Sequence, residues 1–298
     1  MLDHKELETL VAIIDCGSFE AAARRLHISP GAVSQRIKGL ENRVGQPLLV
    51  RRQPPVATEV GSTVLQHARK VLLLQDEVEA ALWPAASSQG HSVSVAINHD
   101  SLNCWFMVVV MAVQKDVPVN FDIRTMDNRA ALEQLKRGEV MGAITSVVQD
   151  VPGCRSRVLG RLGYVAVCST SFHQRYFSQG LHADSLSHAP YLCHDRCDDL
   201  ADAVLARYQA SQTLANTHYI PSTPMIADAV AQGLGWGMLP STLVEKHPAR
   251  EQLIVLDGPE VNVELHWKRW DIQSDTLAVI ERHLFAVARA CLNQGQSD

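Results

Sequence analysis

The stretch SFEAAARRLHISPGAVSQRIKGLE, residues 18–41, decides the fold of the amino-terminal region. Ser18 is placed as the N-cap of a helix over 19–26. Ser29 is a second N-cap, and the proline after it takes the first position of a helix that continues over 31–44. Because the connection between the two helices is short, they must cross sharply. The stretch therefore predicts a helix-turn-helix, the motif that docks in the DNA major groove.

A further helix precedes this motif. Leu7, Leu10, Val11 and Ile14 share one face at helical spacing, and the pattern ends before Gly17. This face predicts a first helix that packs on the helix-turn-helix.

A basic hairpin and a long helix follow the motif. The apolar run 48–50, followed by RRQPP at 51–55, predicts a strand, a rigid turn and a return, which is a basic wing. Thr58 then caps a helix that extends to about Leu82, with an apolar stripe of Val64, Leu65, Ala68, Val71, Leu72, Val78 and Leu82. A stripe on so long a helix needs a partner, so we expect pairing with a second copy in a dimer. The alternative is packing on its own domain.

The charge distribution supports contact with nucleic acid. The chain of 298 residues has a net charge of −5, but residues 24–70 carry nine basic and two acidic side chains, a net of +7. A local basic face within an acidic protein is typical of phosphate contact. The alternative is a solvated basic surface.

The length of 298 residues indicates two or three domains, and 46% hydrophobic residues are enough for a buried core. The features below indicate a cytoplasmic protein. The longest apolar run, 105–113, is far shorter than the ~20 residues that span a bilayer, so no membrane partner is expected. The charged start of the chain lacks an export signal. Seven scattered cysteines fit a reduced compartment better than a disulfide framework.

Beyond a linker at 83–90, strands and helices alternate as in a parallel α/β sheet. The expected strands are 93–97, 119–124, 140–145, 164–168, 217–220, 236–239 and 263–267, and the expected helices are 102–113, 127–137, 199–208, 224–232 and 275–292. We therefore predict a DNA-binding domain over 1–58, a linker and dimerisation helix with a hinge over 59–90, and a regulatory domain over 91–298. Its two subdomains would comprise about 91–162 with 268–298, and about 163–267.

Three stretches, 18–29, 32–41 and 45–51, closely resemble the signature of LysR-type transcription regulators. Other stretches, at 98–102, 137–143, 233–240 and 265–267, resemble the arginine- and lysine-responsive branch of that family (ArgP and LysG types). The resemblance implies an α/β protein with an N-terminal all-α winged helix-turn-helix, a long linker helix and a two-subdomain, periplasmic-binding-protein-like effector domain.

The resemblance makes the helix over 31–44 the recognition helix. The side chains that it places toward DNA are Ser29, Pro30, Ser34, Gln35, Arg36 and Lys38, with Arg51 and Arg52 in the wing. Glutamine and arginine can form paired hydrogen bonds with adenine or guanine edges, whereas Ser34 and Lys38 suit phosphates. The wing arginines would add contacts that do not depend on DNA sequence.

The resemblance also implies an effector cleft between the two subdomains. Asp100 would pair with an ammonium group, while Ser101, Ser222 and Thr223 would hold a carboxylate, as suits an amino acid. Asp195, Asp198 and Asp199 form an acidic loop that would attract a cationic side chain, and Asp127 is a further candidate carboxylate. The alternatives are a plain N-cap for Asp100 and a solvated loop at Asp195. His99, Asn128 and the segment 193–197 depart from the branch, so the ligand can differ from lysine or arginine.

The sequence gives weaker support to other functions, namely metal binding, dinucleotide binding and catalysis. Cys193, His194 and Cys197 are soft metal ligands, but a structural zinc site needs four ligands in paired spacings, so no metal or cofactor is expected. The glycines at 233–237 follow a helix and precede a strand, the reverse of a dinucleotide-binding loop. No catalytic motif is found, so an enzyme is not expected, and a solute-binding protein is the better rival for 91–298.

The function expected from the sequence is that of a DNA-binding regulator set by a small molecule, lysine or arginine, which controls genes such as an amino-acid exporter. Its partners would be a double-stranded DNA operator, the effector, one or three further copies of the chain, and RNA polymerase.

Overall fold

The computed structural model describes residues 2–50, 52–83, 91–211 and 214–294. Arg51 and most of the expected linker, 84–90, lie outside the described residues. The chain divides into two compact units. The first unit comprises Met1–Asn98, Val108–Arg157 and His266–Phe285, and the second comprises His99–Met107, Val158–Leu265 and Ala286–Asp298. The expected subdomain boundaries differ, because 99–107 and 286–298 belong to the second unit.

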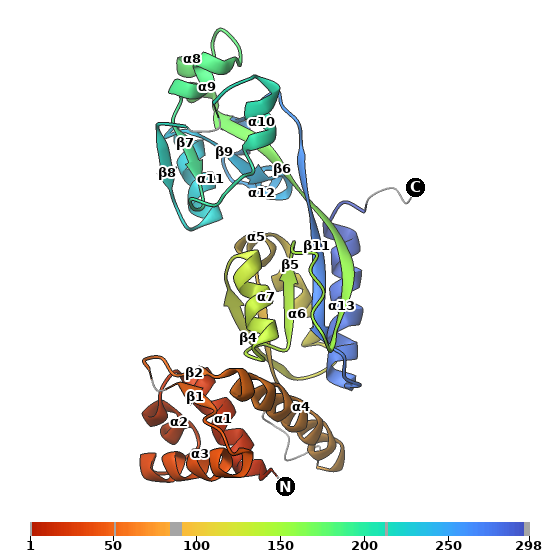
Figure 1. Ribbon diagram of the computed structural model, residues 1–298. Coiled ribbons are helices and arrows are strands. Elements are labelled where there is room, and N and C mark those ends of the chain that lie inside the picture. Colours follow the sequence, from red (N-terminus) through yellow and green to blue (C-terminus); the bar gives the residue numbers. More distant parts are fainter. Residues whose placement is uncertain (1, 51, 84–90, 212–213, 295–298) are drawn as a thin grey trace. The chain divides into compact units, whose positions relative to one another are not determined.

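The first unit begins with the expected winged helix-turn-helix, which we call the head (Figure 1). Its elements are α1 (His4–Cys16), α2 (Phe19–Arg25), α3 (Pro30–Val44), β1 (Leu49–Val50) and β2 (Val56–Ala57). The hydroxyl of Ser18 accepts the backbone N–H of Ala21, and that of Ser29 accepts the N–H of Ala32. Both N-caps predicted from the sequence are therefore confirmed.

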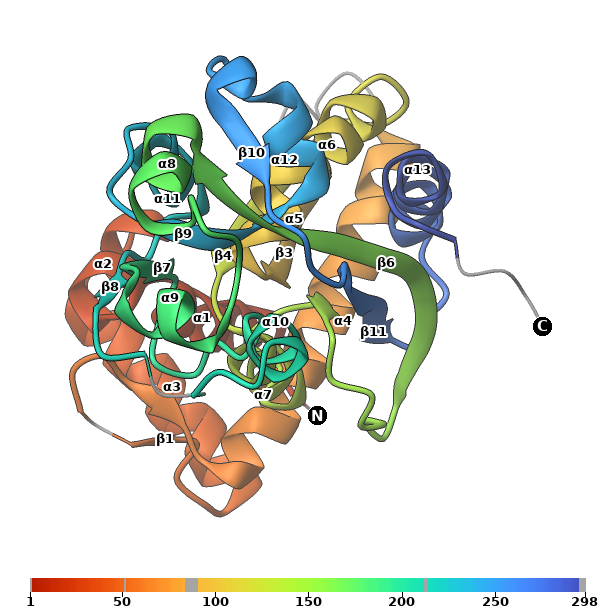
Figure 2. The same cartoon turned by 90° about the horizontal axis from the view of Figure 1, so that it is seen from above.

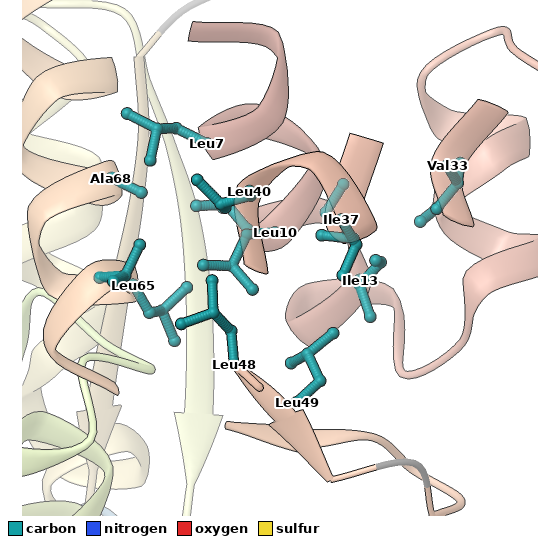
Figure 3. Packing of buried hydrophobic residues seen from close by; sticks show 14 of the residues in the cluster. Leu7, Leu10, Ile13, Val33, Ile37, Leu40, Leu48, Leu49, Leu65 and Ala68 are labelled. Atoms are coloured by element: carbon teal, nitrogen blue, oxygen red, sulfur yellow. The ribbon is translucent and has the colours of Figure 1, made fainter. Parts of the chain in front are cut away.

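The head has one apolar core, which Figure 3 shows from close by. Leu10 and Ile13 of α1 meet Ile37 and Leu40 of α3, and all four are at most 1% exposed. Each such side chain contributes about 1.5–3 kcal/mol through burial. The core fixes the angle between α2 and α3, and it leaves the opposite face of α3 to solvent.

The long helix α4 (Glu59–Leu82) begins at the expected cap, since Thr58 Oγ1 accepts the N–H of Gly61 at 2.9 Å. Leu65 and Ala68 in its first half are fully buried in the core of the head. Val78 and Leu82 in its second half are 57% and 62% exposed. The apolar stripe therefore packs on its own domain at one end and stays open at the other.

The sheet of the first unit has the order β4-β3-β5-β11. Its strands are β3 (His91–Ile97), β4 (Val119–Thr125), β5 (Gly142–Thr145) and the second half of β11 (Val261–Trp270). Strand β3 is parallel to β4 and β5, whereas β11 is antiparallel to β5. Its helices are α6 (Met107–Val113), α7 (Asn128–Lys136) and most of α13 (Asp275–Cys291).

The sheet of the second unit has the order β6-β9-β7-β8, with β10 paired to β6. Its strands are β6 (Cys154–Ser169), β7 (Tyr191–Cys193), β8 (Thr217–Tyr219), β9 (Trp236–Pro240) and β10 (Leu253–Val255). Its helices are α5 (His99–Ser101), the π-helix η1 (Leu102–Phe106), α8 (Thr170–Tyr176), α9 (Ala183–His188), α10 (Asp202–Arg207), α11 (Thr223–Ala231), α12 (Ser241–Lys246) and the 3₁₀ turn η2 (Arg250–Gln252).

Both sheets are mixed, which corrects the expectation of a parallel sheet. Strand β6 pairs antiparallel with β9 and β10. Strands β6 and β11 each contain residues of both units (Figures 1 and 2), so they connect the units through the chain itself. The helix expected from residue 102 begins at His99 and passes through the π-helical turn η1. Asp100 therefore lies inside the first helical turn.

Candidate functional site

The solvent face of α3 carries most of the residues expected to read DNA. Ser34, Gln35 and Lys38 are exposed, and so are Ser29 and Pro30 at the start of the helix. Val33, Ile37 and Leu40 point the other way, into the core. This face presents one amide, one ammonium and two hydroxyl groups to an incoming partner.

Arg36 differs from its neighbours on α3. It is half-buried, and its Nη1 donates to Thr9 Oγ1 of α1 at 3.3 Å. The Thr9 hydroxyl in turn donates to the carbonyl of Lys5 at 2.6 Å. The guanidinium is therefore directed partly toward α1. This contact with α1 was not expected from the role in base recognition.

Two groups can be distinguished among the basic residues counted over 24–70. Arg43 pairs with the largely buried Glu6 of α1, while Arg25 and Arg69 pair with Asp15. These side chains hold elements of the first unit together. The second group, Arg24, Lys38 and Arg52, is exposed and makes no ion pair within the described residues. The expected phosphate-binding surface therefore rests on fewer cations than the sequence count suggests.

The second unit contains a carboxylate held by two hydroxyl groups. Tyr164 of β6 donates to Asp100 Oδ2 at 2.6 Å, and Thr223 at the start of α11 donates to Oδ1. Burial and the nearby Asp100 charge raise the pKa of Tyr164 well above 10, so the phenol keeps its proton and remains a donor. Both donors are neutral. These two bonds therefore bring no positive charge to Asp100, and the remaining lone pairs of its carboxylate can accept from a cation.

Two imidazoles lie beside this carboxylate. The ring centroids of His99 and His194 are 4.6 Å apart, and His194 Nδ1 lies 3.4 Å from Asp195 Oδ2. Burial and the neighbouring His194 lower the pKa of His99 below 6.5, so near neutral pH this ring is mostly uncharged. The two rings are tilted by 42° to each other, so they form an angled aromatic surface beside the carboxylate.

A third carboxylate, that of Asp198, shares this region. It accepts the backbone N–H groups of Leu200 at 3.0 Å and His194 at 3.3 Å. Burial raises its pKa, and the charges of Asp100 and Asp195 raise it further. Within the residues that the structure describes, no lysine or arginine pairs with any of the three carboxylates. The cluster of Asp100, Asp195 and Asp198, which we call the acidic cluster, is a site of negative potential suited to a cation.

The structure brings together only some of the residues expected at the effector site. Thr223 contacts Asp100 directly instead of standing free to hold a carboxylate, and Ser222 precedes it without capping α11. Ser101, expected to hold the ligand carboxylate, is fully buried. Asp127 belongs to the first unit and caps α7 by accepting the N–H groups of Arg129 and Ala130.

The sequence did not single out Tyr164 or His194 for the effector site. Tyr164 is predicted only as the first residue of a strand. His194 lies in an irregular loop, whose chain path no periodicity predicts. The nearest signal was the density of acidic residues between 195 and 199.

The two cysteines that flank the loop of His194 and Asp195 differ in exposure. Cys193 is buried with its Sγ 3.4 Å from the carbonyl of Asp195, whereas Cys197 is exposed. In the described part of the chain, no group of three or more histidine, cysteine or acidic residues is arranged to hold a metal ion. No helix among the described residues is both long and apolar enough to cross a lipid bilayer.

Two family models match this chain, one over the amino-terminal region and one over most of the remaining chain. The model for the bacterial regulatory helix-turn-helix protein, lysR family, matches residues 4–62, and that for the LysR substrate binding domain matches 86–274. The transcriptional regulator LysG of Mycobacterium bovis is 37% identical over 295 residues, which cover 99% of this chain and 96% of the relative.

Two solved structures have similar folds. The crystal structure of ArgP from Mycobacterium tuberculosis has a TM-score of 0.82 and 37% identity, and the match covers 99% of this chain and 100% of that one. Full-length LysG from Corynebacterium glutamicum with bound effector Arg has a TM-score of 0.75 and 34% identity, covering 98% and 99%. These matches confirm the fold class and the branch expected from the sequence.

Proposed function

Because the chain belongs to the LysR family of bacterial transcription regulators, we propose that it binds a DNA operator under the control of a basic amino acid, L-arginine or L-lysine. The observation that carries the ligand class is the acidic cluster. Burial and the charges of Asp100 and Asp195 raise the pKa of Asp198, and no lysine or arginine among the described residues pairs with any of the three carboxylates. Each of these amino acids brings two positive charges, which such a site favours. The LysG structure with bound arginine supports the same class.

In this proposal Asp100 receives one cationic group of the ligand. Tyr164 and Thr223 fix the orientation of its carboxylate, and Asp195 and Asp198 face the second cationic group. The tilted rings of His99 and His194 provide aromatic faces against which a guanidinium can lie. Ser222, next to Thr223 before α11, remains the candidate donor for the ligand carboxylate. Asp127 is not assigned a ligand contact.

The decisive experiment compares charged amino acids with neutral analogues of the same shape. We expect L-arginine and L-lysine to raise the melting temperature of the purified protein, whereas L-citrulline and L-norleucine leave it unchanged. Isothermal titration calorimetry would then give the dissociation constants. A shift with citrulline equal to that with arginine would contradict a cation site, and the absence of any shift with the four compounds would overturn the ligand proposal.

Effector affinity should fall on acidification. Asp198 has a raised pKa, and a bound cation favours its charged form, so binding strengthens as the pH rises through that pKa. His99 has a pKa below 6.5, and its protonated form would repel the ligand, so binding weakens as the pH falls through that value. Both effects have the same sign. Titrations at pH 5, 6 and 7.5 should give a dissociation constant that increases steadily toward pH 5.

DNA recognition is proposed to use the exposed face of α3 and the wing, with Gln35 reading bases and Ser34, Lys38 and Arg52 contacting phosphates. We expect Q35A to weaken binding to an operator selected from random duplexes by about 1–3 kcal/mol while binding to competitor DNA changes little. K38A should weaken both about equally and reduce the salt slope by about one. Titrations by fluorescence anisotropy at several salt concentrations would separate the two effects. Equal losses on operator and competitor for Q35A would remove it from base recognition.

We further propose that the active species is a homodimer or homotetramer in the cytoplasm. Support comes from the second half of α4, where Leu74, Val78 and Leu82 are 40–62% exposed at helical spacing, as expected of a surface covered by a second copy. The relatives are named as transcription regulators, and we propose that the chain has no catalytic activity. Regulation of genes such as an amino-acid exporter, through RNA polymerase, completes the proposal.

A further inference from the structure

One carboxylate of the head is surrounded by three arginines from different elements. Asp15, near the end of α1, pairs with Arg25 of α2 at 3.3 Å, with Arg69 of α4, and with Arg124 of β4 at 3.0 Å. The side chain of Asp15 is only 14% exposed, and that of Arg69 only 7%. Although burial raises its pKa, the three positive charges lower it below the ordinary value, so the group is ionised at neutral pH.

Helix α4, which carries Arg69, also forms hydrogen bonds with the end of α7 and the loop that follows it. Arg69 Nε donates to the carbonyl of Gly138 at 2.8 Å, and Gln66 Nε2, one turn earlier on α4, donates to the carbonyl of Lys136 at 2.6 Å. Gly138 is tightly packed here, since an added Cβ would lie 2.9 Å from the backbone nitrogen of Gln66. The head and α4 therefore contact β4 and this loop through hydrogen bonds with little room for adjustment.

Arg124 of β4 is paired with a residue of β3, the strand that leads into the segment of Asp100. In the parallel pairing of β3 with β4, Arg124 is opposite Ala96. The chain leaves β3 at Ile97 and enters α5, where Asp100 is the second residue. Only four positions along the chain separate the partner of Arg124 from Asp100. A displacement of α5 on ligand binding would thus act directly on the strand that positions Arg124.

We propose that the contact of Arg124 with Asp15 couples effector binding at Asp100 to the position of the DNA-binding head. Arg124 is a positioning residue in this assignment: it touches neither ligand nor DNA. The inference rests on the proposed function, because it requires that arginine or lysine alters operator binding. It adds the residue pair through which that effect passes.

Arg25 provides a matched control. It pairs with the same carboxylate, but it belongs to α2 and so makes its contact entirely inside the head. R25Q and R124Q each remove one arginine from Asp15, yet only R124Q removes the connection to β4. R124K keeps a positive charge at that position and serves as the conservative variant. Thermal unfolding of all three would establish that they fold.

The measured quantity is the coupling factor, the ratio of operator dissociation constants without and with saturating L-arginine. We expect R124Q to move this ratio toward one by about threefold or more, the range of coupling changes that single residues produce. R25Q and R124K should stay within about twofold of the parent chain. Calorimetry should show that arginine itself still binds to R124Q.

Two results would overturn this inference. The first is a coupling factor for R124Q equal to that of the parent chain, and the second is an equal loss in R25Q, which would indicate general loosening of the head. If the parent chain binds operator but its affinity does not change with arginine or lysine, the proposed effector response fails, and the inference fails with it. That result is distinct, because it is obtained before any variant is made.

Discussion

Asparagine in place of Asp100 is expected to weaken L-arginine binding at least about 30-fold, which corresponds to about 2 kcal/mol. The substitution keeps the size of the side chain. The amide oxygen can accept from one of the two hydroxyl groups of Tyr164 and Thr223, and the other hydroxyl can rotate to accept from the amide NH2. It removes the negative charge that the proposed ligand requires. Calorimetric titration of the D100N protein with arginine measures the loss directly, and operator binding without arginine should remain within about twofold.

The size of this effect follows from what surrounds the carboxylate. Asp100 is partly buried and its present partners are two neutral hydroxyl groups, so no lysine or arginine in the described part of the chain competes with the ligand there. In such a setting, truncating one side of a charge-assisted hydrogen bond costs more than at an exposed site, because the cation left behind is poorly solvated. Y164F, which loosens the carboxylate but keeps its charge, should show a smaller loss.

A control in the same unit separates local from general electrostatics. Asp184, in the first turn of α9, is 80% exposed, and D184N also removes one negative charge. We expect D184N to bind arginine as the parent chain does. If D184N loses as much affinity as D100N, the acidic cluster acts only through net charge, and if D100N binds arginine normally, Asp100 is not a ligand contact.

The head could be predicted nearly residue by residue because its signals are local. Caps at Ser18, Ser29 and Thr58 fix where helices begin. In the structure, each of these hydroxyl groups accepts a hydrogen bond from the backbone N–H three residues later. Such bonds connect residues three apart, so the sequence contains both partners in one short window. The apolar faces of α1 and α3 are equally local.

The candidate site depends on contacts between distant residues. Tyr164 and Thr223 meet Asp100 from 64 and 123 positions away in the chain. Spacing cannot reveal such pairs when each residue alone fits an ordinary strand or helix start. The start of strand β6 could not be predicted for a related reason. In its first five residues, CRSRV from residue 154, four consecutive side chains are exposed, so this segment lacks the alternation that marks a half-buried strand.

The long-range ion pairs could not be predicted either. The sequence count treated Arg25, Arg43 and Arg69 as part of a basic surface, because charge runs are usually solvated. Arg69 is in fact 6% exposed. Its carboxylate partner lies 54 positions earlier, on α1, and only the packing of α4 against the head brings the two together.

Alanine in place of Asp15 is expected to lower the free energy of unfolding by about 3–5 kcal/mol, the usual cost of removing one member of a buried ion pair. Arg69 would keep its hydrogen bond to Gly138, but its charge would stay buried without a counter-ion. Arg25 and Arg124 would lose a shared partner as well. Urea unfolding at pH 7, followed by circular dichroism, measures the difference from the parent chain.

Asp122 provides a matched control for D15A. The pH dependence of stability tests whether the charge of Asp15 causes the loss. Asp122 pairs with Arg124 at 2.7 Å but is 45% exposed, so D122A should cost no more than about 1 kcal/mol. The pKa of Asp15 is lowered in the folded protein, so its contribution is complete above the unfolded carboxyl pKa, about 3.9, and declines as the pH falls through the folded value. The stability gap between parent and D15A should therefore narrow only below about pH 4. Equal costs for D15A and D122A, or a gap that is already closed at pH 5, would show that the three arginines do not depend on the Asp15 charge.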